Sequence, residues 1–443
     1  MTEAGQESMK FAAGLSGHAQ AVRAAEHACE RVKAELERID FAAVFISVHH
    51  VDSAQAVSAI VRRRLSPRCL VGVSAESVLG GEVELEQTPG ISVLAARMPG
   101  VGIRPFRLEE LGRVTPEAAP ETLAERSGMN AAFRGMMLLA DPFSVPVNTL
   151  LPSLSKARGW MRGAAGAGER RTPESSPLPP ILGGMASAAS KPGGNVLFMN
   201  DQLMRSGAVG VSFSGRVRID SLVSQGCRPF GPVVVITGAK GQIITTLGRR
   251  KALDVLRDAI EGLDEPSREL LKRNIFMGRA VSEYKDRFGR GDFLVRGVVG
   301  VDQESGALAV ADMVRVGQTV QFHLRDAATA DDDLGLLLDG QKMHEPPAGA
   351  LLFTCNGRGC RLFDDPNHDA LALTRAFLPD PTAEERAKGG QPLGPSSARV
   401  RGGEALPIAG FFAAGEIGPV GDEVFLHGHT ASVMLFREEG TRH

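Results

Sequence analysis

Two apolar runs near the C-terminal end of the chain lead into polar residues that could bind a ligand or act in catalysis. Residues 351–360 read LLFTCNGRGC, and residues 408–421 read IAGFFAAGEIGPVG. Both runs are rich in β-forming residues and end in small residues followed by polar side chains. Where such strands lie parallel in one sheet, the side chains just past their carboxyl ends converge in a crevice that commonly binds ligands. The same pattern is also typical of two buried strands followed by ordinary tight turns.

Charged residues at these strand ends predict recognition of a small carboxylate. Arg358 offers two parallel donors, and the glycine that follows it lets a backbone approach closely. Glu416 would present a carboxylate to an α-amino group. Glu76 follows a similar strand earlier in the chain, so two carboxylates at matching positions favour one shared site. Asn356 joins this set, although the Asn-Gly pair that it begins is equally typical of a turn with positive φ.

Cys355 stands where a nucleophile, or a thiol that contacts a ligand, would be expected. Arg358, three residues later, would favour its thiolate. A catalytic cysteine also needs a base, and only His427 and His429 offer one in the same half. Both rings would point to one face unless Gly428 bends the segment. A structural role in a tight turn is the commoner fate of a single cysteine, and we expect that role here.

Other clusters of reactive residues predict structure rather than chemistry. Cys355, Cys360 and His368 lack the paired spacing of a zinc site, so no metal is expected. No phosphate-binding glycine loop is present, and we expect no cofactor. Arg228 follows a bend at residues 226–227, where it either anchors a carbonyl group or contacts the ligand. The charged segment 285–292 predicts a salt-bridged surface or interdomain contact.

Three stretches repeat one plan of strand, helix, strand and a later strand, which predicts parallel crossovers in mixed β-sheets with helices outside. The fold class is therefore α/β, built from strand-helix-strand repeats in two associated halves. The elements of the three stretches are 41–48, 53–64, 69–73 and 91–95; 136–140, 147–154, 180–183 and 208–213; and 350–354, 368–377, 408–412 and 431–436.

A segment of different character separates the second and third repeats, and it places the boundary between the halves near residue 231. We therefore predict domains at 9–231 and 232–438. In this segment we expect a hairpin at 233–247, a helix at 253–263, further strands at 293–299 and 320–324, and a helix at 331–338. An amphipathic helix that buries Cys29 precedes the first repeat. The stretches 162–180 and 379–404 are rich in Gly, Pro and polar residues, which predicts flexible insertions at the surface.

The composition is that of an ordinary globular protein. Lys and Arg number 50 and Asp and Glu number 52, for a net charge of −2. The charge predicts no attraction to nucleic acid, and one Trp and one Tyr do not suggest a stacking platform for bases. No apolar run reaches ~18 residues, and no signal peptide precedes the first strand, so we expect no membrane association. Five scattered cysteines favour a reducing compartment, and we predict a cytoplasmic location.

Ordered blocks over nearly the whole chain resemble the FIST family, with FIST N and FIST C domains in tandem. Because these blocks are spread over residues 9–437 in one order, chance similarity is a poor explanation. They are MKFAAGLS (9–16), LVGVSAES (70–77), SQGCRPFGP (224–232), YKDRFGRGD (284–292), VRGVVGVD (295–302), VGQTVQFHLRDA (316–327), CNGRG (355–359), GEIGP (415–419) and FLHGHTA (425–431).

The resemblance implies a sensory module of intracellular signal transduction that binds a small ligand such as an amino acid. Its expected partners are that ligand and a signalling protein. On this interpretation the ligand-binding candidates are Glu76, Arg228, Cys355, Asn356, Arg358, Glu416 and His427. Two alternatives stay open: a hydrolase or transferase that uses Cys355 with His427 or His429 and Glu416, and an adaptor that recruits proteins. A sensor is favoured over an enzyme, because a crevice of convergent polar groups does not demand turnover.

Overall fold

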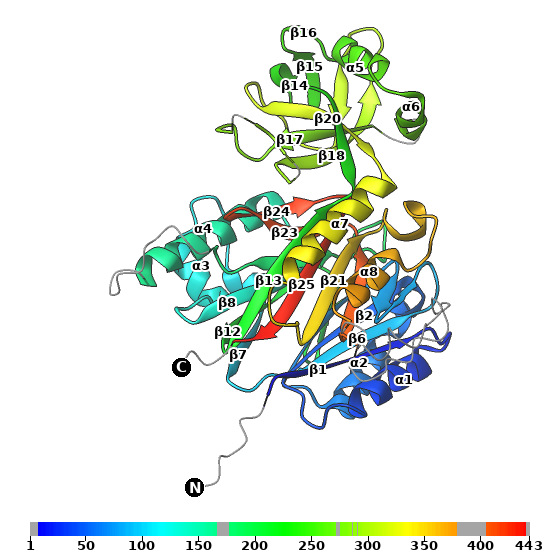
Figure 1. The fold of residues 1–443 in the computed structure, drawn as a ribbon. Coiled ribbons are helices and arrows are strands. Elements are labelled where there is room, and N and C mark those ends of the chain that lie inside the picture. Colours follow the sequence, from blue (N-terminus) through cyan, green and yellow to red (C-terminus); the bar gives the residue numbers. More distant parts are fainter. Residues whose placement is uncertain are drawn as a thin grey trace.

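The computed structural model describes residues 8–165, 177–271, 275–285, 287–289, 291–378 and 405–439. These residues form a larger α/β core and a smaller β-barrel, which lies above the core in Figure 1. The mixed α/β class expected from the sequence is confirmed. The predicted insertion at 379–404 lies outside the described residues, as does most of the insertion at 162–180.

Three repeats of one unit build the core. Each repeat runs strand, helix, strand, helix, strand, hairpin, strand. Within a repeat the second and third strands are parallel, and the last strand lies antiparallel between the first and the second. Repeat one consists of β1 (Lys10–Ser16), α1 (Ala21–Lys33), β2 (Phe41–Ser47), α2 (Ala54–Leu65), β3 (Cys69–Ala75), the hairpin β4 (Val78–Gly80) and β5 (Val83–Leu85), and β6 (Ile91–Arg97).

Repeats two and three follow the same order, and the strands and helices predicted for all three units are confirmed. Repeat two consists of β7 (Val101–Arg107), α3 (Pro120–Ser127), β8 (Phe133–Ala140), α4 (Val147–Ala165), β9 (Ile181–Met185), the hairpin β10 (Leu197–Met199) and β11 (Gln202–Met204), and β12 (Ala208–Gly215). Repeat three consists of β13 (Val217–Gln225), α7 (Ala327–Gln341), β21 (Gly349–Cys355), α8 (His368–Ala376), β22 (Ile408–Ala413), the hairpin β23 (Glu416–Val420) and β24 (Glu423–His427), and β25 (Thr430–Glu438).

Each repeat donates its hairpin to the sheet of another repeat. The hairpin β4–β5 of repeat one pairs with β22 of repeat three, and the hairpin β23–β24 of repeat three pairs with β9 of repeat two. The hairpin β10–β11 of repeat two pairs with β3 of repeat one. The exchange is cyclic, so the three sheets share one strand order and no repeat has a complete sheet of its own.

Buried serines tie two of these hairpins back to their own repeats. Ser92 lies opposite Phe45 and donates to the Leu79 carbonyl at 2.5 Å. Ser432 lies opposite Phe353 and donates to the Ile417 carbonyl at 3.0 Å. The same contact at the same place shows that repeats one and three agree in side-chain detail as well as in topology.

Aromatic side chains from all three repeats meet in one core. Phe45 of repeat one lies 5.0 Å from Phe411 of repeat three, measured between ring centroids. Phe41 lies 5.3 Å from Phe213 of repeat two, which in turn lies 5.4 Å from Phe436. These rings are almost entirely buried. Because the same cluster draws on every repeat, burial of its apolar surface stabilises the three sheets as one body.

The barrel is an insertion between β13 and α7 of repeat three. Its strands form one sheet that closes through the pairing of β14 with β15. At its base, Gly226 and Asp326 join it to the core through a backbone hydrogen bond of 3.3 Å. The barrel contains β14 (Cys227–Lys240), β15 (Ile243–Leu247), β16 (Arg250–Lys251), α5 (Ala252–Glu261), α6 (Glu265–Leu271), β17 (Ile275–Ala280), β18 (Phe293–Val301), β19 (Leu308–Val310) and β20 (Thr319–Arg325).

Helix α1 shows how the helices cover the outer faces of the sheets. Its alanines and Cys29 are buried, which confirms the amphipathic helix expected there. The helix packs very closely on β1, because a Cβ atom at Gly14 would lie 2.0 Å from the Ala28 carbonyl oxygen. Among the described residues no helix is long and apolar enough to cross a bilayer.

Candidate functional site

Polar side chains gather where the barrel joins the core, at the carboxyl end of β21. We call this group the neck cluster and define it as Arg325, Cys355, Asn356, Arg358, Glu416 and His429. Eleven buried side-chain polar atoms in the described part of the chain have no hydrogen-bond partner, and five of them belong to this cluster. Buried polar atoms are seldom left unpaired, so this concentration marks the neck cluster as the candidate site.

Glu416 lies at the centre of the neck cluster and is fully buried at the start of β23. Its Oε2 accepts from Thr430 Oγ1 at 2.8 Å and from the Thr430 backbone N–H at 3.2 Å, whereas Oε1 has no partner among the described residues. Burial raises the pKa of Glu416 to about 8. The carboxyl group is therefore largely protonated at neutral pH.

Cys355 ends β21, and its thiol lies close to the Glu416 carboxyl group. Burial in protein surroundings raises the pKa of the Cys355 thiol to about 12, and the nearby Glu416 carboxylate contributes in the same direction. The charge of Arg325 lowers the pKa of the thiol, but it does not offset that desolvation. The thiol is neutral at physiological pH, which is the opposite of what a nucleophilic cysteine requires.

The two histidines occupy different surroundings. His427 is buried, and its Nε2 lies 3.1 Å from the Gly418 carbonyl oxygen, so it has a structural partner. The chain turns at Gly428, and His429 takes a left-handed backbone conformation with φ of 64°. The His429 ring lies 4.4 Å from that of Phe276 in the barrel, and its Nδ1 is buried without a partner among the described residues. Burial lowers the pKa of both imidazoles to about 4.

Arg325 reaches the neck cluster from the end of β20 in the barrel. Its Nη2 donates to the Gly357 carbonyl, and its Nε is buried without a partner among the described residues. A Cβ atom at Gly357 would lie 2.9 Å from the guanidinium nitrogens, so this position favours glycine. Asn356 is partly exposed, and its Oδ1 also lacks a partner in the described chain. The loop 355–357 is thus the partly exposed side of the cluster.

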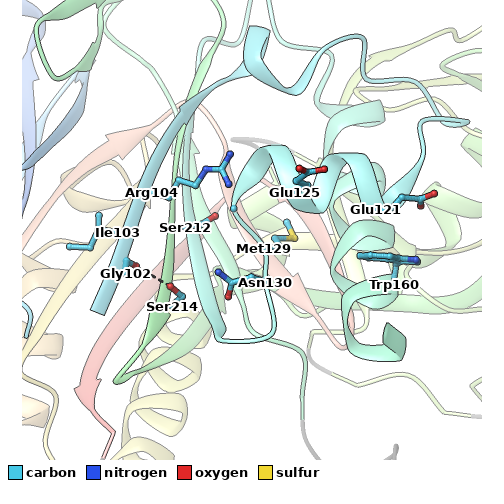
Figure 2. A pocket seen from close by; sticks show the side chains of 11 residues that line it. Gly102, Ile103, Arg104, Glu121, Glu125, Met129, Asn130, Trp160, Ser212 and Ser214 are labelled. Atoms are coloured by element: carbon cyan, nitrogen blue, oxygen red, sulfur yellow. Dashed lines mark hydrogen bonds between the residues drawn. The ribbon is translucent and has the colours of Figure 1, made fainter. Parts of the chain in front are cut away.

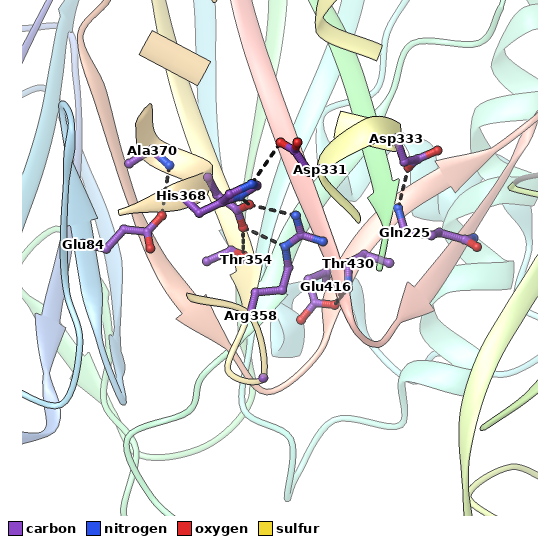
Figure 3. A network of polar contacts seen from close by, with 12 residues as sticks. Glu84, Gln225, Asp331, Asp333, Thr354, Arg358, His368, Ala370, Glu416 and Thr430 are labelled. Atoms are coloured by element: carbon purple, nitrogen blue, oxygen red, sulfur yellow. Dashed lines mark hydrogen bonds and ion pairs between the residues drawn. The ribbon is translucent and has the colours of Figure 1, made fainter. Parts of the chain in front are cut away.

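Arg358 faces a protein carboxylate instead of an open site. Its Nε and Nη2 donate to the two oxygens of Asp369 at 2.7 and 2.8 Å, and both side chains are fully buried (Figure 3). Thr354 donates to the same carboxylate at 2.6 Å. The two parallel donors expected to bind a ligand are therefore occupied within the protein. Only Nη1 is unpaired among the described residues, and it lies beside Gly226, where a Cβ atom would be 3.2 Å away.

Two other candidate residues lie in ion pairs away from the centre of the cluster. Glu76 pairs with Arg361, which also donates to the Asn356 carbonyl at 2.8 Å. Glu76 precedes β4 by two residues, whereas Glu416 is the first residue of β23. The two glutamates therefore do not hold matching positions in their repeats. Arg228 donates to Asp326 at 3.0 Å and to Ser267 at 2.8 Å, which anchors the barrel rather than facing the cluster.

Repeat two provides an internal comparison for the neck cluster. Strand β8 ends at Ala140, which pairs with Met185 as Cys355 pairs with Ala413. The residue that follows, Asp141, accepts from Asn195 at 2.9 Å and from Ser144 at 2.6 Å. Its two oxygens are satisfied within the protein, unlike the polar atoms at the same end of repeat three.

The charge balance of the neck cluster favours an anion. Arg325 reaches the cluster from the barrel, and burial lowers the pKa of its guanidinium. Arginine is effectively always protonated in proteins, so Arg325 brings a positive charge to the cluster. Arg358 is neutralised by Asp369, and Glu416 is largely protonated. The remaining positive charge has no carboxylate to balance it in the cluster.

The geometry does not assemble a catalytic cysteine. No hydrogen bond joins the Cys355 thiol to an imidazole in the described part of the chain; the His429 contact is through its backbone. A base with a pKa near 4 and a thiol with a pKa near 12 are poorly matched for proton transfer at neutral pH. No group of His, Cys, Asp and Glu among the described residues could hold a metal ion.

Reaction of the five cysteines with iodoacetamide should separate the two roles of Cys355. At pH 7 to 8 we expect exposed Cys360 to be alkylated and Cys355 to be protected, because burial holds the Cys355 pKa near 12 while Cys29, Cys69 and Cys227 are buried. Mass spectrometry of the digested protein measures this, with Cys360→Ser as the control that should abolish labelling. Rapid labelling of Cys355 at pH 6 would favour the catalytic alternative.

The fold and the site together define an α/β protein with threefold internal repetition and a polar cluster between its core and an inserted barrel. The FIST N domain model matches residues 40–250, and the FIST C domain model matches residues 252–383. The chain belongs to the FIST family, a family of sensory domains in signal transduction, with the two domains in tandem. The two matches meet at β16, and the domain limits of 9–231 and 232–438 stay predictions.

Proteins of mycobacteria resemble the chain over nearly its whole length. An uncharacterized protein of Mycobacterium tuberculosis (strain CDC 1551 / Oshkosh) is 34% identical over 442 residues, covering 97% of this chain and 100% of the relative. An uncharacterized protein of Mycobacterium bovis (strain ATCC BAA-935 / AF2122/97) is 34% identical over 445 residues with the same coverage. A solved structure titled "Cyanuric acid hydrolase: evolutionary innovation by structural concatenation" covers 63% of this chain and 84% of that chain. With 12% identity and a TM-score of 0.22, it is too distant to indicate an activity.

Sequence reasoning missed Arg325, Asp369 and Thr430 as parts of the site. A signal existed for Arg325, because it directly follows the predicted strand 320–324 and so also stands at a strand end. Asp369 and Thr430 had no comparable signal, because a single Asp in the first turn of a helix, or a Thr in a strand, is common in every fold.

Proposed function

We propose that the neck cluster binds a small carboxylate-bearing metabolite such as an amino acid, and that the protein acts as its sensor. The observation that carries the proposal is the set of unpaired buried donors and acceptors that converge there. Arg325 Nε and Arg358 Nη1 would donate to the ligand carboxylate, and Glu416 Oε1 and Asn356 Oδ1 would accept from its ammonium group. The ligand would enter past the partly exposed loop 355–357.

The position of the cluster suggests how binding would become a signal. Arg325 and Phe276 belong to the barrel, whereas Cys355, Glu416 and His429 belong to the core. A ligand held between them would make contacts with both bodies at once and would favour one position of the barrel relative to the core. A signalling partner would read that position. Glu76, Arg228 and His427 would support the site from outside, through the ion pairs and the hydrogen bond described above.

A calorimetric comparison of Arg325→Gln with the natural chain tests the proposal. A thermal-shift screen over amino acids and simple carboxylates first identifies a ligand, since saturating ligand raises stability by roughly 2.7 kcal/mol at 100 times its Kd. For that ligand we expect Arg325→Gln to weaken binding by roughly 1.5–3 kcal/mol, the usual value of a hydrogen bond to a charged group. Asn356→Ala should weaken binding less, because it removes a neutral acceptor.

The matched control is Glu117→Gln, which changes an exposed carboxylate in repeat two. It should bind as the natural chain does, and unliganded melting curves should show that all three variants are folded. The proposal is wrong if no amino acid or carboxylate stabilises the protein, or if Arg325→Gln binds the identified ligand with unchanged affinity.

A further inference from the structure

A cleft of about 500 Å³ opens on repeat two, on elements other than those of the neck cluster. Figure 2 shows its floor on β7 and β12 and its wall on α3, the loop after α3, and α4. The residues that carry charge or an aromatic ring are Arg104, Glu121, Glu125 and Trp160. The volume lies within the range of about 300–1,000 Å³ that is typical of small-molecule sites.

The floor of the cleft holds one unpaired cation. Arg104 lies opposite Ser212 in the register of β7 and β12, as Gly102 lies opposite Ser214. The Arg104 stem packs on Gly128, which has φ of +80° and where a Cβ atom would lie 2.7 Å from Arg104 Cδ. No hydrogen bond or ion pair of the Arg104 guanidinium is found in the described part of the chain. The arginine is therefore held in place and still free to bind an anion.

The wall of the cleft holds the opposite charge and a ring. Glu121 and Glu125 lie one turn apart on α3, and both are exposed without an ion pair among the described residues. Trp160 on α4 is 45% exposed and faces the same space (Figure 2). A cationic group between these residues would gain from the carboxylates and from the face of the indole.

The cleft exists because repeat two differs from repeat one at the same place. In repeat one, α1 packs on β1 so closely that Gly14 has no room for a Cβ atom. The helix at that place in repeat two, α3, has 8 residues, whereas α1 has 13. Beside α3, strand β7 therefore stays partly uncovered, and Gly102 and Arg104 are exposed there. The opening thus distinguishes repeat two from repeat one.

We propose that this cleft is a second ligand site, which takes a small molecule with a cation at one end and a carboxylate at the other. A basic amino acid such as arginine or lysine has this chemistry. Its carboxylate would bind Arg104, and its side-chain cation would lie between Trp160 and the two glutamates of α3. A peptide that ends in arginine carries the same two groups, and the experiment separates the two sources. The proposal is independent of the ligand of the neck cluster.

The single tryptophan makes the site directly measurable. Trp160 is the only Trp in the chain, so the emission of the protein on selective excitation reports on this cleft. L-Arginine or L-lysine should change the emission in a saturable way, and L-glutamate and glycine should not. Agmatine, which lacks the carboxylate, should bind about 10-fold more weakly than arginine. The tripeptide Gly-Gly-Arg tests the peptide source; if it binds better than free arginine, the natural ligand is a peptide end.

Charge substitutions separate the two ends of the ligand. Arg104→Gln should weaken arginine about 10-fold and leave agmatine unchanged, whereas Glu125→Gln should weaken both. Glu117→Gln is the matched control outside the cleft, and Arg325→Gln in the neck cluster should leave the Trp160 response unchanged. The proposal fails if neither fluorescence nor calorimetry detects arginine or lysine at about 10 mM. It also fails if Arg104→Gln weakens arginine and agmatine equally.

Discussion

Residues 1–231 and 232–443, expressed separately, should each be insoluble or lack a cooperative melting transition. The cut falls inside β14 and separates β13 from β25, which are paired over nine residues. It also removes hairpin β23–β24 from β9 and hairpin β4–β5 from β22. Each fragment would then expose sheet edges and the apolar faces of a core that all three repeats share, and such surfaces drive association.

Co-expression of the two fragments should restore a soluble complex with the far-ultraviolet circular dichroism of the intact chain. The matched control is replacement of residues 227–325 by a short linker, which removes the barrel and leaves every hairpin exchange intact. That variant should fold, because Gly226 and Asp326 already lie side by side. Two independently soluble fragments with sharp melting would show that the halves are autonomous and that hairpin exchange adds little to stability.

The repeats could be predicted from the sequence because their signals are local. Strand β2 is buried at all seven positions and reads as a continuous apolar run, as a central strand with both faces covered should. A predicted helix between two such runs indicates a crossover, so the two strands are expected to pair in parallel. The hairpin exchange could not be predicted, because β4, β5, β10 and β11 have three residues each. Strands this short carry too little periodicity to indicate their partners, which lie far away in the sequence.

The sequence indicated where strands end, but not which side chains would lie against the residues that follow them. Cys355 and Glu416, at two such strand ends, lie close together at the neck, and their role in ligand binding stays a prediction. The partner of a charged residue depends on which side chains the fold brings to it. Arg358 meets Asp369 because α8 begins beside the end of β21, and Glu76 meets Arg361 across two repeats. Neither pairing leaves a pattern in the sequence.

The second large effect concerns Glu416 and pH. In the unfolded chain this carboxyl group should lose its proton near its ordinary pKa of 4.5, whereas in the folded protein burial raises the pKa to about 8. Between these values the unfolded state binds fewer protons than the folded state, so stability falls as pH rises. This loss of folding stability is absent below about pH 4.5 and complete above about pH 8. The loss of stability is on the order of 5 kcal/mol.

Glu416→Gln should remove most of this pH dependence. Glutamine has the shape of the protonated carboxyl group and can still accept from Thr430, so at pH 5 we expect the variant to match the natural chain or to be slightly less stable. At pH 8.5 the variant should be the more stable of the two by a few kcal/mol. Urea unfolding at the two pH values measures the difference. Burial also raises the pKa of Glu84 to about 8. Its effect on the pH dependence of stability is the same in both proteins, so it cancels from the difference between them.

The same variant connects the pH effect with the proposed ligand. An ammonium group placed against Glu416 would favour the ionised carboxylate, so binding below pH 8 should release a proton from the natural chain. Calorimetry in two buffers with different ionisation enthalpies detects that proton, and Glu416→Gln should release none. Glu117→Gln should behave as the natural chain in both experiments. If stability depends on pH equally in Glu416→Gln and in the natural chain, Glu416 does not have the raised pKa. If the ligand binds without proton release, it does not place an ammonium group against Glu416.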